Sequence, residues 1–174
     1  MTDRGAAELV ETKTGDAVPP MAGWLLHKEA KKGLEMDDAK TKSGDVKRIL
    51  IVEDEATLSY FLAYSLMSEA EDYEVVTARD AETAVSKMEE KAFHLLISDI
   101  VLPQMDGLTL LRQTQKQWPQ TKTILMTAYG SPEVRTRAEA MGAFAYIEKP
   151  FVYSRMRDVV LQALHGAEAR STAE

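Results

Sequence analysis

Two hydrophobic patterns alternate along the chain from about residue 47 onward. The first is a short, nearly continuous run of apolar residues, which is typical of a strand buried on both faces of a parallel sheet. Five such runs predict five strands: RILIV (48–52), YEVVTA (73–78), HLLISD (94–99), KTILMTA (122–128) and FAYIEK (144–149).

The second pattern is helical spacing of apolar residues after each strand, and it predicts five helices. The first helix covers about residues 55–69, and others follow Asp80, Gly107 and Ser131. Asp80 and Ser131 can cap their helices, and Pro132 fits a first helical position, where a missing N–H costs nothing. The residues at helical spacing are Leu58, Phe61, Leu62, Ser65 and Leu66; Ala81, Ala84, Val85 and Met88; Leu108, Leu111 and Trp118; and Met156, Val159, Val160, Ala163 and Leu164.

Strands that alternate with helices predict an α/β fold: a doubly wound five-stranded parallel sheet with helices on both faces. A chain of 174 residues is long enough for one domain with a sizeable core and some excess. We assign this domain to residues 46–166 and a C-terminal tail to residues 167–174.

Residues 1–45 have a different composition. They contain 9 acidic and 7 basic residues with no sustained apolar period, which predicts a mostly disordered N-terminal extension. Trp24, Leu25 and Leu26 precede a charged run that favours helix. Two interpretations stay open: a linker with a transient helical turn, or a short arm that docks on this domain or on a partner.

Overall composition excludes several function classes. Hydrophobic residues make up 45% and charged residues 28%, as in ordinary globular proteins. A net charge of −7 argues against a general binder of nucleic acid or anionic membranes. The absence of cysteine excludes a disulfide framework and a thiolate metal site. No apolar run approaches a membrane span and no signal peptide is evident, so we expect no membrane segment and a cytoplasmic location.

Polar residues gather where the predicted strands end. Asp99 ends the third strand, Glu53 and Asp54 follow the first, Thr127 ends the fourth, and Lys149 ends the fifth. The carboxyl ends of parallel strands lie at one edge of a sheet, where ligands of such folds bind. An isolated Asp would be interpreted as a cap or a satisfied core residue, but five polar side chains at one edge predict a functional site.

The segments ILIVEDE, ISDIVLPQMDG, ILMTAYG and AYIEKPF resemble the receiver domain of two-component response regulators over about residues 46–166. The resemblance implies a flavodoxin-like strand order, 2-1-3-4-5. The family often has Asp where this chain has Glu53, although Glu is also common there.

The resemblance further implies that Asp99 accepts a phosphoryl group from a phosphohistidine of a sensor histidine kinase, or from a small phosphodonor. Up to three negative charges from Glu53, Asp54 and Asp99 require a cation between them, and hard carboxylate oxygens suit Mg²⁺. By resemblance the backbone carbonyl of Val101 completes the metal ligands. Asp99 then acts as a nucleophile that forms an acyl phosphate.

Other residues take their expected roles from the same resemblance. Lys149 should pair with phosphoryl oxygens, Thr127 should donate its hydroxyl to another, and the Tyr146 ring should turn inward when Thr127 moves. The Lys149–Pro150 peptide should be cis. The face formed by residues 131–160 should then change and bind a downstream partner protein.

Val101 and Tyr129 flank the expected acyl phosphate, two positions after Asp99 and Thr127. Neither side chain readily orients an attacking water and the Tyr129 ring can shield the site, so we expect slow self-dephosphorylation.

Alternative functions remain at this point. The first is a phosphorelay intermediate that passes the phosphoryl group to a histidine phosphotransfer protein. The second, a hydrolase of the haloacid dehalogenase type, needs an Asp where Val101 stands, so we do not expect an enzyme beyond self-phosphorylation and slow dephosphorylation. Four residues follow Arg170, and we expect no DNA-binding domain. His27, His94 and His165 lack the spacing of metal ligands.

Deletion of residues 1–44 should leave the domain folded and phosphorylatable, because the extension lacks a periodic apolar face. Thermal unfolding of the full and shortened chains, together with phosphoryl labelling of both, tests this. A large fall in the melting temperature of the shortened chain would show instead that the Trp24 segment packs on the domain.

Overall fold

The computed structural model describes residues 46–69 and 73–166, which all belong to the second of two units of the chain, Ser43–Glu174. The expectations for residues 1–45, including the Trp24 segment, and for the tail at 167–174 lie outside these described residues.

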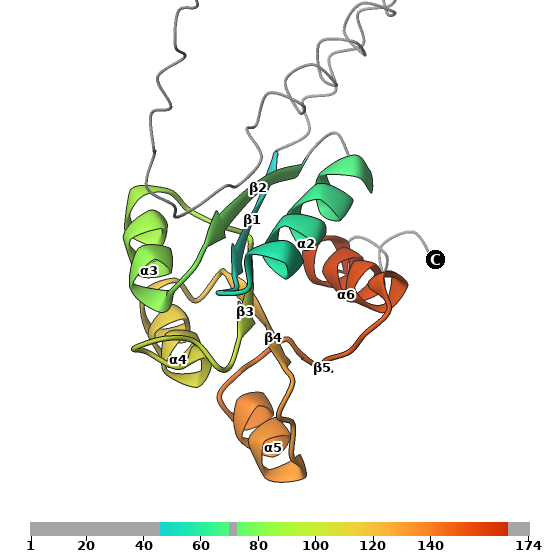
Figure 1. Ribbon diagram of the computed structural model, residues 1–174. Helices are drawn as coiled ribbons and strands as arrows, with labels where there is room; N and C mark the ends of the chain where they lie inside the picture. Colours follow the sequence, from blue (N-terminus) through green and yellow to red (C-terminus); the bar gives the residue numbers. More distant parts are fainter. Residues whose placement is uncertain (1–45, 70–72, 167–174) are drawn as a thin grey trace, which may run out of the picture. The chain divides into compact units, whose positions relative to one another are not determined.

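The described residues form a parallel sheet in the order β2-β1-β3-β4-β5 (Figure 1). The strand order and the parallel pairing confirm the predicted fold. At the carboxyl edge, Val52 pairs with Ser98, Asp99 with Met126, and Thr127 with Glu148, so these strand ends lie side by side. The strands are β1 (Lys47–Val52), β2 (Tyr73–Ala78), β3 (Leu95–Asp99), β4 (Lys122–Thr127) and β5 (Ala145–Glu148).

Helices cover both faces of this sheet. One face packs against α2 and α6, and the other against α3, α4 and α5 (Figure 1). Within the described part of the chain, no helix is long and apolar enough to cross a membrane. The helices are α2 (Ala56–Glu69), α3 (Ala81–Glu90), α4 (Gly107–Gln117), α5 (Pro132–Ala140) and α6 (Tyr153–His165).

The two faces divide the residues of each central strand between two cores. Ile49 and Ile51 of β1 point toward α2 and α6, whereas Leu50 and Val52 point toward α3, because successive side chains of a strand alternate between faces. All four side chains are fully buried. Burial on both faces is why the strand is continuously apolar rather than alternating.

Phe61 is the exception among the residues whose spacing predicted α2. Its side chain is 48% exposed, and its ring packs edge-on against Tyr153 of α6 with centroids 6.0 Å apart. Leu62 and Leu66 face the core as expected. The spacing predicted the helix but not which side of it faces the core, because α2 is apolar nearly all round: no charged residue occurs between Ala56 and Ser68, and Tyr60 and Tyr64 are also exposed.

A tight turn after β3 requires a glycine. The Gly107 N–H donates to the Ile100 carbonyl at 2.9 Å, and a Cβ on Gly107 would lie 2.1 Å from the backbone oxygen of Asp99. Such a contact is impossible without moving the backbone, so a side chain is excluded here. Asp106 then caps α4 by accepting from the Thr109 N–H at 2.8 Å. This turn holds the loop from Ile100 to Asp106 against the end of β3.

Candidate functional site

Three carboxylates meet at the carboxyl edge of the sheet. Glu53 and Asp54 directly follow β1, Asp99 ends β3, and one carboxylate oxygen from each lies within 4.8 Å of the others. The Glu53 N–H donates to the Ala78 carbonyl at 3.1 Å, which holds Glu53 at the end of the β1–β2 pair. The parallel strands therefore bring together the acidic residues that the sequence predicted at this edge.

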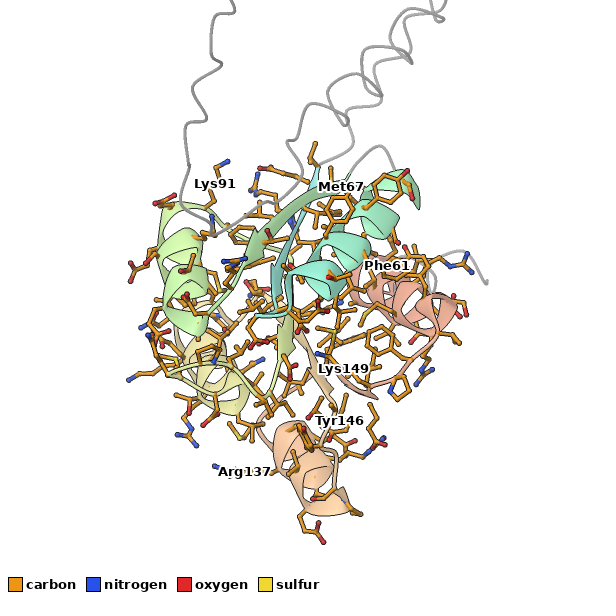
Figure 2. The ribbon with its side chains drawn as sticks, viewed as in Figure 1. Phe61, Met67, Lys91, Arg137, Tyr146 and Lys149 are labelled. Carbon is orange, nitrogen blue, oxygen red and sulfur yellow. The ribbon has the colours of Figure 1, made fainter. Side chains whose placement is uncertain are left out.

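Lys149, which follows β5, joins two of these carboxylates (Figure 2 labels its position). Its Nζ lies 2.6 Å from Glu53 Oε2 and 2.5 Å from Asp99 Oδ2. Glu53 is 1% and Asp99 6% exposed, whereas Asp54 is exposed. One ammonium group thus offsets the repulsion of two buried carboxylates, and the third carboxylate faces solvent.

The pKa values of both Glu53 and Lys149 are raised within this cluster. Burial raises the pKa of Glu53, and the attraction of Lys149 reverses this only partly. Burial alone would lower the pKa of Lys149, but its hydrogen bonds to Asp99 and Glu53 and their charges raise that pKa above its ordinary value. Lys149 is therefore held in its charged form, and the raised pKa means that Glu53 takes up a proton more readily than an ordinary Glu.

The carboxylate of Asp99 is held in one orientation. The Val101 N–H donates to Asp99 Oδ1 at 2.9 Å, while Oδ2 accepts from Lys149. The Ile100 N–H donates to the Met126 carbonyl at 2.8 Å and keeps the start of this loop on the sheet. Val101 therefore lies next to Asp99, and its side chain is 53% exposed at the surface.

Thr127 lies at the next strand end. It is 1% exposed, and its Oγ1 accepts from the Tyr129 N–H at 3.0 Å, while the Tyr129 side chain is 79% exposed. The Lys149 N–H donates to the Thr127 carbonyl at 2.7 Å, so the backbone links Thr127 to the lysine of the cluster. The Thr127 hydroxyl accepts this bond and keeps its own proton for a further acceptor.

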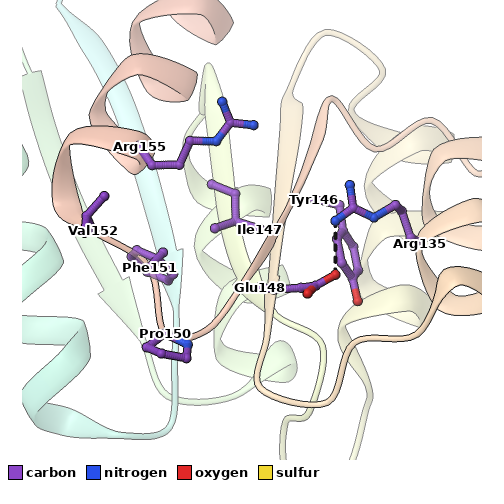
Figure 3. Close-up of a pocket in the computed structure, with 8 residues that line it drawn as sticks. All are labelled: Arg135, Tyr146, Ile147, Glu148, Pro150, Phe151, Val152 and Arg155. Atoms are coloured by element: carbon purple, nitrogen blue, oxygen red, sulfur yellow. Dashed lines mark hydrogen bonds and ion pairs between the residues drawn. The ribbon is translucent and has the colours of Figure 1, made fainter.

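Tyr146 lies inside β5, three residues before Lys149. It is 7% exposed, and within the described residues its hydroxyl has no hydrogen-bond partner. Burial, with a smaller effect of Glu148, raises the pKa of this hydroxyl. The guanidinium of Arg135 lies over the ring, 4.9 Å from its centroid, and also pairs with Glu148 (Figure 3).

The Lys149–Pro150 peptide and two of the three histidines lie in the described part of the chain. The Lys149–Pro150 peptide is cis, as the family resemblance implied. His94 lies before β3, at the opposite edge, where its Nδ1 accepts from the Arg48 N–H at 3.0 Å. His165 ends α6 and is hydrogen-bonded to the Tyr73 hydroxyl at 3.0 Å. His27 lies outside the described residues.

Sequence reasoning missed two groups of residues. Glu55 accepts from the N–H groups of Thr57 and Leu58 at 2.9 and 2.8 Å, so it caps α2 directly beside the acidic pair. An acidic residue before a predicted helix was the available signal. Arg135 and Glu148 were also missed, because nothing in their spacing predicts that they meet over Tyr146.

Comparison with known proteins places this architecture in a family. The sequence model of the response regulator receiver domain matches residues 49–161. The response regulator protein FleR of Pseudomonas aeruginosa is 35% identical over 113 residues, which cover 65% of this chain and 24% of FleR. The phosphate regulon transcriptional regulatory protein PhoB of Rhizobium meliloti is 40% identical over 107 residues, which cover 60% of this chain and 46% of PhoB.

Solved structures agree with this result. A CheY-like response regulator receiver domain from Methanospirillum hungatei has a TM-score of 0.67 and 34% identity, covering 72% of this chain and 98% of that domain. The signal receiver domain of an HD domain-containing protein from Pseudomonas fluorescens has a TM-score of 0.66 and 28% identity, covering 80% of this chain and all of that domain.

The fold and the acidic edge define a receiver-type signalling protein. The chain belongs to the response regulator receiver family, whose members act in two-component signal transduction, are regulated by phosphorylation and generally depend on Mg²⁺. The match spans only about a quarter to a half of the length of the curated relatives.

Lys149→Met should destabilise the folded domain, because it leaves Glu53 and Asp99 buried without their shared cation. We expect the free energy of unfolding at about pH 7 to fall by about 3 kcal/mol. This loss should shrink as the pH falls toward 4.5, the ordinary pKa of Glu, because the raised pKa of Glu53 lets the folded variant take up a proton there first. Urea unfolding across this pH range measures both effects.

The pH dependence of unfolding at high pH and a control variant complete the test of Lys149. The pKa of Lys149 is raised in the folded state, so its contribution to the free energy of unfolding is full below pH 10.5, its ordinary pKa. This contribution is lost as the pH rises through the pKa of the folded state, and Lys149→Met should not show that loss of stability. Lys91→Met removes an exposed lysine that lies 3.4 Å from Glu74, and should cost less than about 1 kcal/mol. Equal losses for the two variants would contradict the role of Lys149.

Proposed function

We propose that Asp99 accepts a phosphoryl group from a sensor histidine kinase phosphohistidine or a small phosphodonor, and that this changes the 131–160 face so that it binds a partner protein. In this proposal residues 46–166 are the receiver domain. The observation that carries it is the meeting of Glu53, Asp54 and Asp99 within 4.8 Å, with Lys149 in contact with two of them.

The residues at this edge fit a Mg²⁺ ion. They offer several hard oxygens at short mutual distance, and the exposed Asp54 leaves the cluster open to solvent, which suits an ion that keeps several waters. Glu53, Asp54, Asp99 and the Val101 carbonyl would hold it. When bound, Mg²⁺ would neutralise the charge that gathers between the attacking carboxylate and the phosphoryl oxygens.

The residues of this chain carry the transfer itself. An oxygen of Asp99 attacks phosphorus, so that a new O–P bond forms while the N–P bond of the donor imidazole breaks and the leaving nitrogen takes up a proton. The Val101 N–H keeps the carboxylate oriented during the attack. Lys149, which donates to Asp99 Oδ2, transfers this hydrogen bond to a phosphoryl oxygen as the acyl phosphate forms.

Two further residues relate the modification to the surface. Thr127 has a hydroxyl proton for another phosphoryl oxygen, and its carbonyl is bonded to the Lys149 N–H. The Tyr146 ring is already buried in this structure, and movement of Thr127 toward the phosphoryl group would leave room for the ring to stay in that inward place. Val101 and Tyr129 lie beside the site with side chains that do not readily orient water, which favours a long-lived acyl phosphate.

Asp99→Asn should abolish phosphorylation, because an amide cannot form the acyl phosphate. Intact mass after incubation with Mg²⁺ and acetyl phosphate should show one added phosphoryl group on the parent and none on the variant. Asp106→Asn is the matched control, since Asn also caps a helix and Asp106 lies on the same loop. Equal labelling of the Asp99 variant and the parent would reject the assignment.

Thr127→Ala should confine the response to the site. A shift of the active form from about 1% to about 99% requires roughly 5.5 kcal/mol, which several charge-assisted contacts can supply together. Amide NMR shifts on adding beryllofluoride should extend from Asp99 across residues 131–160 in the parent, and should stay near Asp99 in the variant. Equally wide shifts in Thr127→Ala would mean that the signal follows another route.

A further inference from the structure

Gly130 lies in the loop between β4 and α5. Because it has no side chain, the end of the Tyr146 side chain fits beside it. A Cβ on Gly130 would lie 2.9 Å from the Tyr146 hydroxyl oxygen and 2.9 Å from Glu148 Cγ. Both distances are shorter than real Cβ contacts, so any side chain at this position would displace these groups. The φ angle of Gly130 lies outside the left-handed region, so the conformation itself does not require glycine.

Arg135 covers a face of the same ring. Its guanidinium lies 4.9 Å from the Tyr146 ring centroid, and its Nη2 donates to Glu148 Oε1 at 3.0 Å (Figure 3). The ion pair is half exposed and contributes little by itself, but it fixes the cation over the ring, where a cation–π contact adds to it. Three segments therefore surround one ring: the loop after β4, helix α5 and strand β5.

The position of this ring shapes the neighbouring surface. Tyr146, Arg135 and Glu148 line an open pocket of about 410 Å³ together with Phe151 and Arg155 (Figure 3). If the ring left its place, the pocket would lose one wall and Arg135 would lose the surface on which it lies. The ring position therefore couples the loop at Gly130 to the 131–160 face.

The geometry points to Gly130 and Arg135 as positioning residues for the Tyr146 switch: Gly130 admits the hydroxyl into its buried place, and Arg135 with Glu148 holds the ring there. The inference rests on the proposed function, in which Tyr146 relates phosphorylation to the partner-binding face. It adds that the balance between the inward and outward ring is set by residues outside the acidic cluster.

Gly130→Ala in the full chain tests this directly. Aromatic NMR with a soluble paramagnetic agent measures how far each ring is exposed to solvent. In the parent, the ring at position 146 should be protected and the ring of Tyr129, which is 79% exposed, should serve as the exposed reference. In Gly130→Ala, relaxation of the Tyr146 ring should rise several-fold toward that reference. Protection equal to the parent would overturn the inference.

Repeating Gly130→Ala in a Tyr146→Phe variant shows whether the ring is exposed by contact with its hydroxyl or by a general destabilisation of the domain. Tyr146→Phe removes the hydroxyl that meets the new methyl group, so adding Gly130→Ala there should expose the ring less than it exposes the Tyr146 ring, because only the contact with Glu148 remains. If Gly130→Ala exposes the Phe ring as much as the Tyr ring, the contact with the hydroxyl is not the cause and the inference fails.

The arginine is tested on its own helix. Arg135→Gln should raise the exposure of the Tyr146 ring, whereas Arg137→Gln, an exposed arginine two positions further along α5, should not (Figure 2). Equal protection of the Tyr146 ring in the two variants would overturn the role of Arg135. This comparison tests the inference even if Gly130→Ala fails to fold.

None of these measurements uses a phosphoryl group. Loss of the ring effect therefore leaves the labelling of Asp99 untouched, and absence of labelling leaves the ring result standing. The two proposals can fail separately.

Discussion

Repulsion between three carboxylates at one edge of the sheet is the constraint on which the rest of this structure depends. Two of them are buried, and Lys149 is the cation that makes their burial tolerable. In the proposed reaction the same ammonium group turns from Asp99 to the phosphoryl oxygens. The stability of the site and its chemistry therefore use one side chain, so a change in the charge of Asp99 alters how Lys149, and the end of β5 that carries it, are held.

The parallel sheet supplies both the cluster and its connection to the surface. Its central strands are buried on both faces, so charged side chains of these strands lie at the strand ends. β4 and β5 lie side by side there, joined by the hydrogen bond from the Lys149 N–H to the Thr127 carbonyl. Tyr146 is three positions before Lys149, within β5, and its ring lies under Arg135 of α5. Strand β5 and helix α5 are thus the two elements that connect the carboxylates to the exposed face.

Much of this arrangement could be predicted from the sequence, for physical reasons that also mark the limits. Apolar runs that end on Glu53, Asp99 and Thr127 placed the edge residues correctly, because parallel strands must align their ends. The strand order came from the family resemblance, since spacing alone does not fix it. The exposure of Phe61 could not be predicted, because α2 has no polar face to orient it. The contact of Arg135 with Glu148 and Tyr146 depends on how α5 packs on β5, which no local pattern encodes.

The turn at Gly107 has a consequence for the donors that this site can use. The Gly107 N–H donates to the Ile100 carbonyl, and there is no room for a Cβ between Gly107 and the carbonyl of Asp99, so the loop is fastened to the strand that carries Asp99. The backbone of Asp99 is therefore held by this turn as well as by the neighbouring strand. In the proposed reaction, a phosphodonor would have to bring its phosphorus to a carboxylate whose backbone is fixed, so the shape of the donor would contribute to its selection.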